Sequence, residues 1–64
     1  MMTLTNKTQW LATMVEADKV ALGGFFTALL KAYTKADNGN RWKIEQSWKD
    51  TIEAEFNVWY KRVE

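Results

Sequence analysis

Two carboxylates stand out among the residues that could do chemistry, because each falls on the apolar stripe of a helical pattern. Asp18 lies in the first half of the chain and Glu55 in the second. Paired carboxylates with shifted pKa values could act as general acid and base. Since buried charges are normally paired, the favoured interpretation is structural: a buried polar pair, with Asp18 hydrogen-bonded to Arg62, Tyr60 or Trp59. An N-cap role for Asp18 stays open.

The remaining catalytic equipment is thin. The chain has no cysteine and no histidine, so thiolate and imidazole are excluded as metal ligands and as general bases. Its acidic residues are not spaced as Ca²⁺ or Mg²⁺ ligands. No phosphate-loop pattern surrounds Gly23-Gly24. The sequence therefore predicts a protein that is not an enzyme, with no catalytic residue, no metal and no cofactor.

Aromatic and basic side chains gather mainly in the second half of the chain. Trp, Tyr and Arg dominate the binding energy of protein interfaces, although aromatic and basic residues together also hold nucleotides and single-stranded RNA. Interspersed acidic residues and a net charge of +1 favour the first interpretation. We predict an interface with another protein, with nucleotide or RNA binding as the alternative. The predicted interface residues are Trp10, Arg41, Trp42, Trp48, Trp59, Tyr60 and Arg62.

The elements that must position these residues are two long helices. Apolar residues recur with helical spacing over about residues 7–36 and again over about 41–62. Each glycine of Gly23-Gly24 costs about 1 kcal/mol inside a helix, so we expect the first helix to be kinked or broken there; a break near residues 16–18 is the other option. Asp37-Asn38-Gly39-Asn40 predicts a turn over residues 37–40.

Two helices joined by a turn predict an all-α fold, an antiparallel helical hairpin that forms a single domain over residues 1–64. A chain of 64 residues buries only about 60% of the surface that its unfolded form exposes, and a lone hairpin leaves one side of its core open. We therefore predict a homodimer, a four-helix bundle with two-fold symmetry. In size and layout the chain resembles the small two-helix proteins that dimerise in this way, such as the plasmid-encoded Rop family. The resemblance is architectural and carries over no functional residue.

Elimination leaves binding as the mode of action. No apolar run reaches the ~20 residues of a membrane span, and the first residues lack the features of a signal peptide, so we expect a cytoplasmic location, the host cytoplasm if the protein is viral. We expect a stoichiometric inhibitor or modulator of a larger protein, of the kind that phages and mobile elements use against host defence systems. This expectation is an analogy of size and composition.

Overall fold

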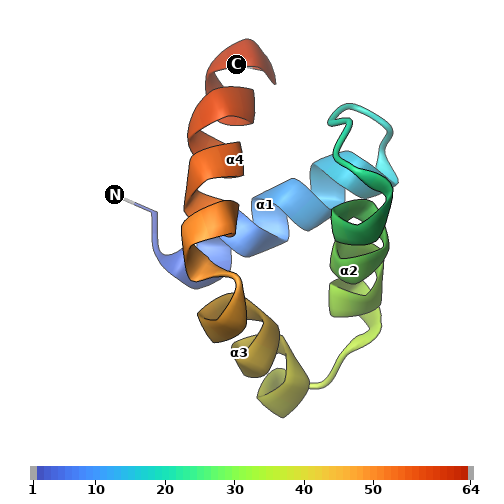
Figure 1. Ribbon diagram of the computed structural model, residues 1–64, viewed down its shortest axis with the longest axis vertical. Coiled ribbons are helices and arrows are strands. Elements are labelled where there is room, and N and C mark those ends of the chain that lie inside the picture. Colours follow the sequence, from blue (N-terminus) through green and yellow to red (C-terminus); the bar gives the residue numbers. More distant parts are fainter. Residues whose placement is uncertain (1, 64) are drawn as a thin grey trace.

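The computed structural model describes residues 2–63 and shows an all-α fold, with four helices and no strand in that range (Figure 1). The helices are α1 (Leu4–Glu16), α2 (Gly24–Lys35), α3 (Asn38–Ser47) and α4 (Lys49–Val63). The prediction of an all-α protein is confirmed. The prediction of two long helices is wrong, because each proves to be two shorter helices with a change of direction between them.

The first helix begins earlier than the apolar pattern indicates. The Thr3 hydroxyl accepts a hydrogen bond from the N–H of Asn6 at 3.0 Å, which makes Thr3 the N-cap of α1. A capping hydroxyl satisfies one of the free N–H groups of the first turn. α1 therefore starts at Leu4 rather than at the predicted residue 7.

The break in the first predicted helix occurs at Asp18, ahead of the glycine pair. The N–H of Lys19 donates to the carbonyl of Met14 at 2.9 Å, and the N–H of Asp18 donates to the carbonyl of Val15 at 3.1 Å. These two bonds form a Schellman motif, whose left-handed position is normally glycine; here Asp18 occupies it with φ 58°. Its side chain is exposed, so the predicted burial of Asp18 is wrong, as is an N-cap role.

The glycine pair lies at the start of α2. Gly23 is the N-cap and Gly24 the first helical residue. Apart from its chain neighbours and the helix's own backbone, a Cβ atom on either would meet nothing within 4 Å, so no close helix crossing requires either glycine. The loop before them is held to the core by Val20, which is 5% exposed.

The predicted turn over residues 37–40 is for the most part the first turn of α3. The Asp37 carboxylate accepts from the N–H of Asn40 at 2.8 Å and caps this helix. The chain changes direction just before it, at Ala36, whose backbone is extended.

The second predicted helix is interrupted at Trp48, where φ is −118° and ψ is 22°. The neighbouring sequence holds no glycine or proline to explain a break. The Trp48 ring packs on two rings of α2, with centroids 5.3 Å from Phe25 and 6.3 Å from Phe26. Tertiary contacts of this kind override local helix propensity, which is a weak preference.

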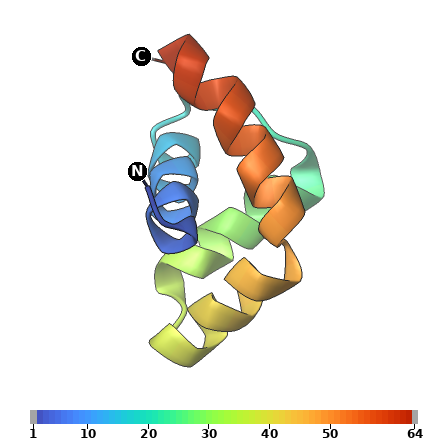
Figure 2. The ribbon, with the colours of Figure 1, turned by 90° about the vertical axis from the view of Figure 1, so that its left-hand side faces the viewer.

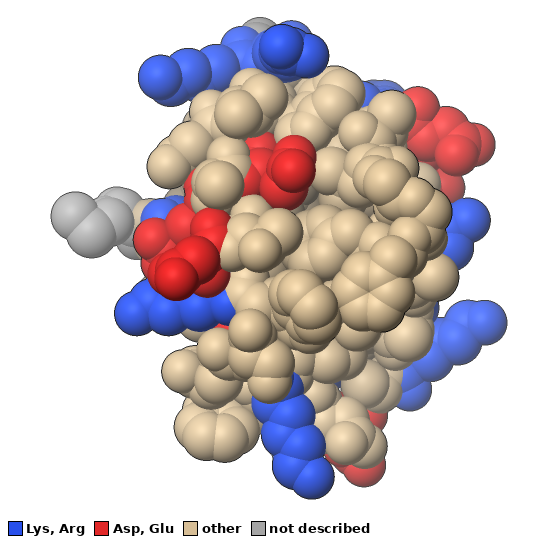
Figure 3. All heavy atoms as spheres, viewed as in Figure 1, with Lys and Arg blue, Asp and Glu red and all other residues tan. Residues whose placement is uncertain are grey.

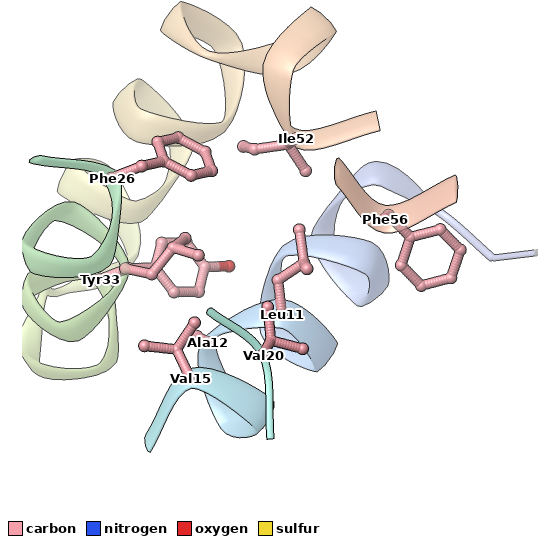
Figure 4. Packing of buried hydrophobic residues seen from close by; sticks show 9 residues of the cluster. Leu11, Ala12, Val15, Val20, Phe26, Tyr33, Ile52 and Phe56 are labelled. Atoms are coloured by element: carbon pink, nitrogen blue, oxygen red, sulfur yellow. The ribbon is translucent and has the colours of Figure 1, made fainter. Parts of the chain in front are cut away.

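The core forms where α1 meets the other helices. α1 lies behind α2 and α4 in Figure 1 and contacts each of the other three helices, and α3 closes one end of the molecule in both views (Figure 2). Buried apolar side chains come from α1, the following loop, α2 and α4 (Figure 4). They are Leu11, Ala12, Val15, Val20, Phe26, Leu30, Tyr33, Ile52 and Phe56. Within residues 2–63, no helix is both long enough and apolar enough to cross a membrane.

Candidate functional site

A buried carboxylate, Glu45, joins three helices. The side chain of Glu45 is on α3 and is 5% exposed. Its two oxygens accept hydrogen bonds from the Tyr33 hydroxyl of α2 at 2.6 Å and from the Thr5 hydroxyl of α1 at 2.9 Å. Hydrogen bonds to a charged acceptor are stronger than neutral ones, so this network fixes α3 against α1 and α2.

The phenol of Tyr33 stays protonated in this network. Burial raises the pKa of Tyr33 well above its ordinary value of 10.0, and the hydrogen bond and negative charge of Glu45 raise it further, while the nearby Arg41 partly lowers it. At neutral pH the hydroxyl is therefore a permanent donor to Glu45.

The Arg41 side chain is also fixed. Its Nε donates to the carbonyl of Tyr33 at 3.1 Å and its Nη2 to the carbonyl of Thr34 at 3.0 Å. The guanidinium lies 5.4 Å from the centre of the Tyr33 ring. These carbonyls belong to the last turn of α2, where cations are favoured, so Arg41 caps α2 and ties it to α3.

A hollow of about 220 Å³ opens beside this network, and the exposed Trp42 lies at its rim. The Trp42 side chain is 61% exposed. The residues around the hollow are Thr5, Gln9, Tyr33, Asn38, Arg41, Trp42 and Glu45; we call them the Trp42 surface. A second hollow of about 260 Å³ also borders on Gln9, Tyr33 and Arg41. Both are smaller than the ~300–1,000 Å³ of typical ligand pockets, so they suit an inserted side chain better than a nucleotide.

Two other predicted interface residues take part in packing. Trp10 lies between two rings of α4, with centroids 5.4 Å from Phe56 and 5.2 Å from Tyr60. Phe56 and Tyr60 stack at 4.7 Å. Trp10 and Tyr60 are both partly buried, so they join α1 to α4 rather than forming an open surface.

The last predicted interface residues lie along α4. The indole N–H of Trp59 donates to Glu55 at 3.2 Å, and the Arg62 guanidinium lies 5.3 Å from the centre of a Trp59 ring. The Glu55 carboxylate therefore has its hydrogen-bond partner, Trp59, within its own helix. The prediction that Asp18 and Glu55 form a buried polar pair is wrong, because Asp18 is an exposed helix end.

Sequence reasoning missed Glu45 and misplaced Phe25. The sequence predicts a pair between Glu45 and Lys49, because they are four residues apart with the charge order that stabilises a helix; in the structure the Glu45 carboxylate instead accepts from Thr5 and Tyr33. Phe25 falls on the apolar face of one long helix, yet it is 65% exposed. Phe26, Leu30 and Tyr33 share one side of a helix, and Phe25 lies about 100° away from Phe26 around that helix.

Comparisons of the chain with protein-family models, with curated proteins and with solved structures give no match. Among residues 2–63, no group of three acidic side chains could hold a metal ion.

Proposed function

We propose that this protein is a non-enzymatic module that binds another protein through the Trp42 surface. The observation that supports it is Trp42, 61% exposed at the rim of a hollow. The interface residues whose truncation weakens binding most are enriched in Trp and Arg and lie in well-packed pockets. Trp42 and the adjacent Arg41 supply both residue types at one such place.

The rigidity of the surface supports the same proposal. Arg41 is held by two carbonyls of α2, and Glu45 is held by hydroxyls of α1 and α2. Binding costs less when the side chains at the contact are already ordered. Gln9 and Asn38 add amide groups at the edge of the hollow, which can donate to and accept from a partner.

The specific role in the proposal is a stoichiometric inhibitor or modulator of a larger protein, of the kind that phages and mobile elements encode, acting in the host cytoplasm. Its support is the small size of the chain and the absence of cysteine and histidine from its sequence. A protein of this kind works by occupying a surface, for which a rigid Trp-marked contact is sufficient.

Site-specific photo-crosslinking tests the proposal. The photoreactive residue p-benzoylphenylalanine replaces Trp42 in one variant and the exposed Asn57 of α4 in a matched control. We expect ultraviolet light to give a protein adduct of defined mass at position 42 and none at position 57, in the cells where the protein acts. Equal adducts at both positions, or no protein adduct at position 42, would contradict the proposal.

Nucleotide or RNA binding is the second candidate, because Trp42 lies next to Arg41 and Lys43 in the sequence. Bases stack on aromatic rings while basic residues contact phosphates. The buried Glu45 carboxylate borders the same hollow and would repel a phosphate, which favours a protein partner. A crosslinked adduct that is sensitive to ribonuclease, with affinity that falls steeply with salt, would support this candidate instead.

A further inference from the structure

Two exposed aromatic rings lie together on a second surface. Phe25 is 65% exposed and Trp48 is 37% exposed, and their ring centroids are 5.3 Å apart. Trp48 also contacts the buried Phe26, so the exposed pair is continuous with the core. We call the surface around Phe25 and Trp48 the aromatic face.

The side of the molecule where these elements lie is broad and nearly free of charge at its centre. Figure 3 looks down the shortest axis and shows a central area without Lys, Arg, Asp or Glu atoms. Phe25 belongs to α2, and Trp48 lies at the junction of α3 and α4. Both α2 and this junction border the uncharged area in the view of Figure 1. The Cα atoms span 30 × 25 × 15 Å, so this is the largest side that a thin molecule can offer. The whole of this side, with its charged edges, is comparable in area to the ~800 Å² that each partner contributes to a standard protein interface.

Charges of opposite sign flank the face. The charged residues of α2 are Lys31 and Lys35, both exposed, whereas the start of α4 carries Asp50, Glu53 and Glu55 against one lysine. Figure 3 shows acidic atoms over α4 and basic atoms projecting from the opposite edge, on the α2 side; a further acidic group lies at the upper right, and other basic atoms project at the top and on the left. A two-fold axis parallel to the long axis would bring α4 of one molecule opposite α2 of another. The charges of these two segments are therefore complementary to each other in a symmetric dimer.

We propose that a second copy of this chain covers the aromatic face. In the resulting two-fold dimer, Phe25 and Trp48 of one copy pack against the same residues of the other, and the acidic start of α4 faces the basic α2. This dimer differs from the bundle of two hairpins that the sequence suggests, because each copy already contains four helices. It goes beyond the proposed function, since it uses residues that do not belong to the Trp42 surface.

Sedimentation equilibrium over a wide concentration range tests the dimer. We expect the mass to rise from 7.5 kDa to twice that value with increasing concentration. Phe25→Asp should raise the dissociation constant at least about tenfold, because interface aromatics carry much of the binding energy. Trp42→Ser, which alters the other strongly exposed aromatic residue, should leave it unchanged. A wild-type protein that stays monomeric, or a dimer more sensitive to Trp42→Ser than to Phe25→Asp, would overturn the proposal.

A charge exchange tests the arrangement of the two copies. The double variant Lys31→Glu, Lys35→Glu should dimerise more weakly than wild type, and so should Asp50→Lys, Glu53→Lys. An equimolar mixture of the two should dimerise better than either alone, because in the mixed dimer opposite charges meet in both contacts, whereas in either variant alone like charges meet in both. A mixture no stronger than its components would overturn the pairing of α4 with α2. Far-ultraviolet circular dichroism of each variant confirms that it is folded, and the crosslinking at position 42 tests the proposed function separately.

Discussion

The hydroxyl of Tyr33 donates a 2.6 Å hydrogen bond to the carboxylate of Glu45, across the two-residue link between α2 and α3. Tyr33 is 1% exposed and Glu45 is 5% exposed, so the bond is shielded from water. A buried carboxylate is costly unless its hydrogen bonds are made. The bond therefore fixes the angle at which α3 leaves α2, and with it the position of Trp42.

Removing this hydroxyl should destabilise the protein. Tyr33→Phe keeps the buried ring but leaves one oxygen of Glu45 without its donor. Loss of a hydrogen bond to a buried charged group costs about 1.5–3 kcal/mol. Urea unfolding at pH 7 should show a fall of this size in the free energy of unfolding. Thr34→Ala, which removes a hydroxyl that bonds only within its own helix, is the matched control and should change stability much less. Equal effects of the two substitutions would contradict the role of Tyr33.

The same hydroxyl should make the fold sensitive to alkali. The pKa of Tyr33 is raised in the folded state above the value of about 10 for an unfolded tyrosine. The folded protein then holds its proton more tightly than the unfolded one, so its stability is fully present below pH 10 and falls as pH rises above 10. Melting temperatures measured between pH 8 and pH 12 should fall more steeply for wild type than for Tyr33→Phe. Parallel curves would show that Tyr33 does not contribute.

The left-handed backbone of Asp18 should make this position open to stabilisation. This conformation costs a non-glycine residue about 1–2 kcal/mol, and less for Asp and Asn. A negative charge near the C-terminus of a helix is also unfavourable. Asp18→Gly should therefore raise the free energy of unfolding by about 1 kcal/mol. Asp18→Asn, which removes only the charge, should raise it by a few tenths. A loss of stability with Asp18→Gly would mean that the side chain makes a contact that its exposure does not suggest.

The two glycines at the start of α2 should respond differently to alanine. Gly24 is the first residue of the helix and has open space around its Cα atom, so Gly24→Ala should stabilise by about 0.4–1 kcal/mol, because alanine lowers the entropy of the unfolded chain. Gly23 is the N-cap, where alanine is a poor residue, so Gly23→Ala should give no gain, while Gly23→Ser should. Thermal unfolding of the three variants measures this order. A gain for Gly23→Ala equal to that for Gly24→Ala would indicate that the helix starts earlier.

The helical character of the chain could be predicted from its sequence, and a break near residues 16–18 was one of two predicted options, whereas the break at Trp48 was not predicted. Apolar spacing is a local property, and it holds its phase through Asp18 and through Trp48. Breaking a helix changes its local free energy by only a few kcal/mol, so contacts with distant residues decide the outcome. Trp48 reaches Phe25 and Phe26 on another helix. Such contacts are not encoded in any short window of sequence.

Only part of the candidate site could be predicted, because contacts between residues that are distant in the sequence form the rest of it. Arg41 and Trp42 were recognised by residue type, and the structure places them together at the rim of one hollow. Glu45 was missed because its partner Thr5 is 40 residues away in the sequence. Once α3 and α4 are separate helices, Glu45 turns towards α1 and the neighbouring α2, and no longer forms the predicted pair with Lys49.

Two tryptophans predicted for one interface should behave in opposite ways, which tests how the structure divides that interface. Trp10 packs between Phe56 and Tyr60, so Trp10→Ala leaves a cavity between α1 and α4 and should lower the free energy of unfolding by more than about 2 kcal/mol. Trp42 is 61% exposed, so Trp42→Ala should change it by less than about 0.5 kcal/mol. Urea unfolding of both variants at pH 7 makes the comparison. A large loss with Trp42→Ala would mean that this ring supports the fold and is not free to bind a partner; a small loss with Trp10→Ala would mean that Trp10 belongs with Trp42 as an exposed anchor.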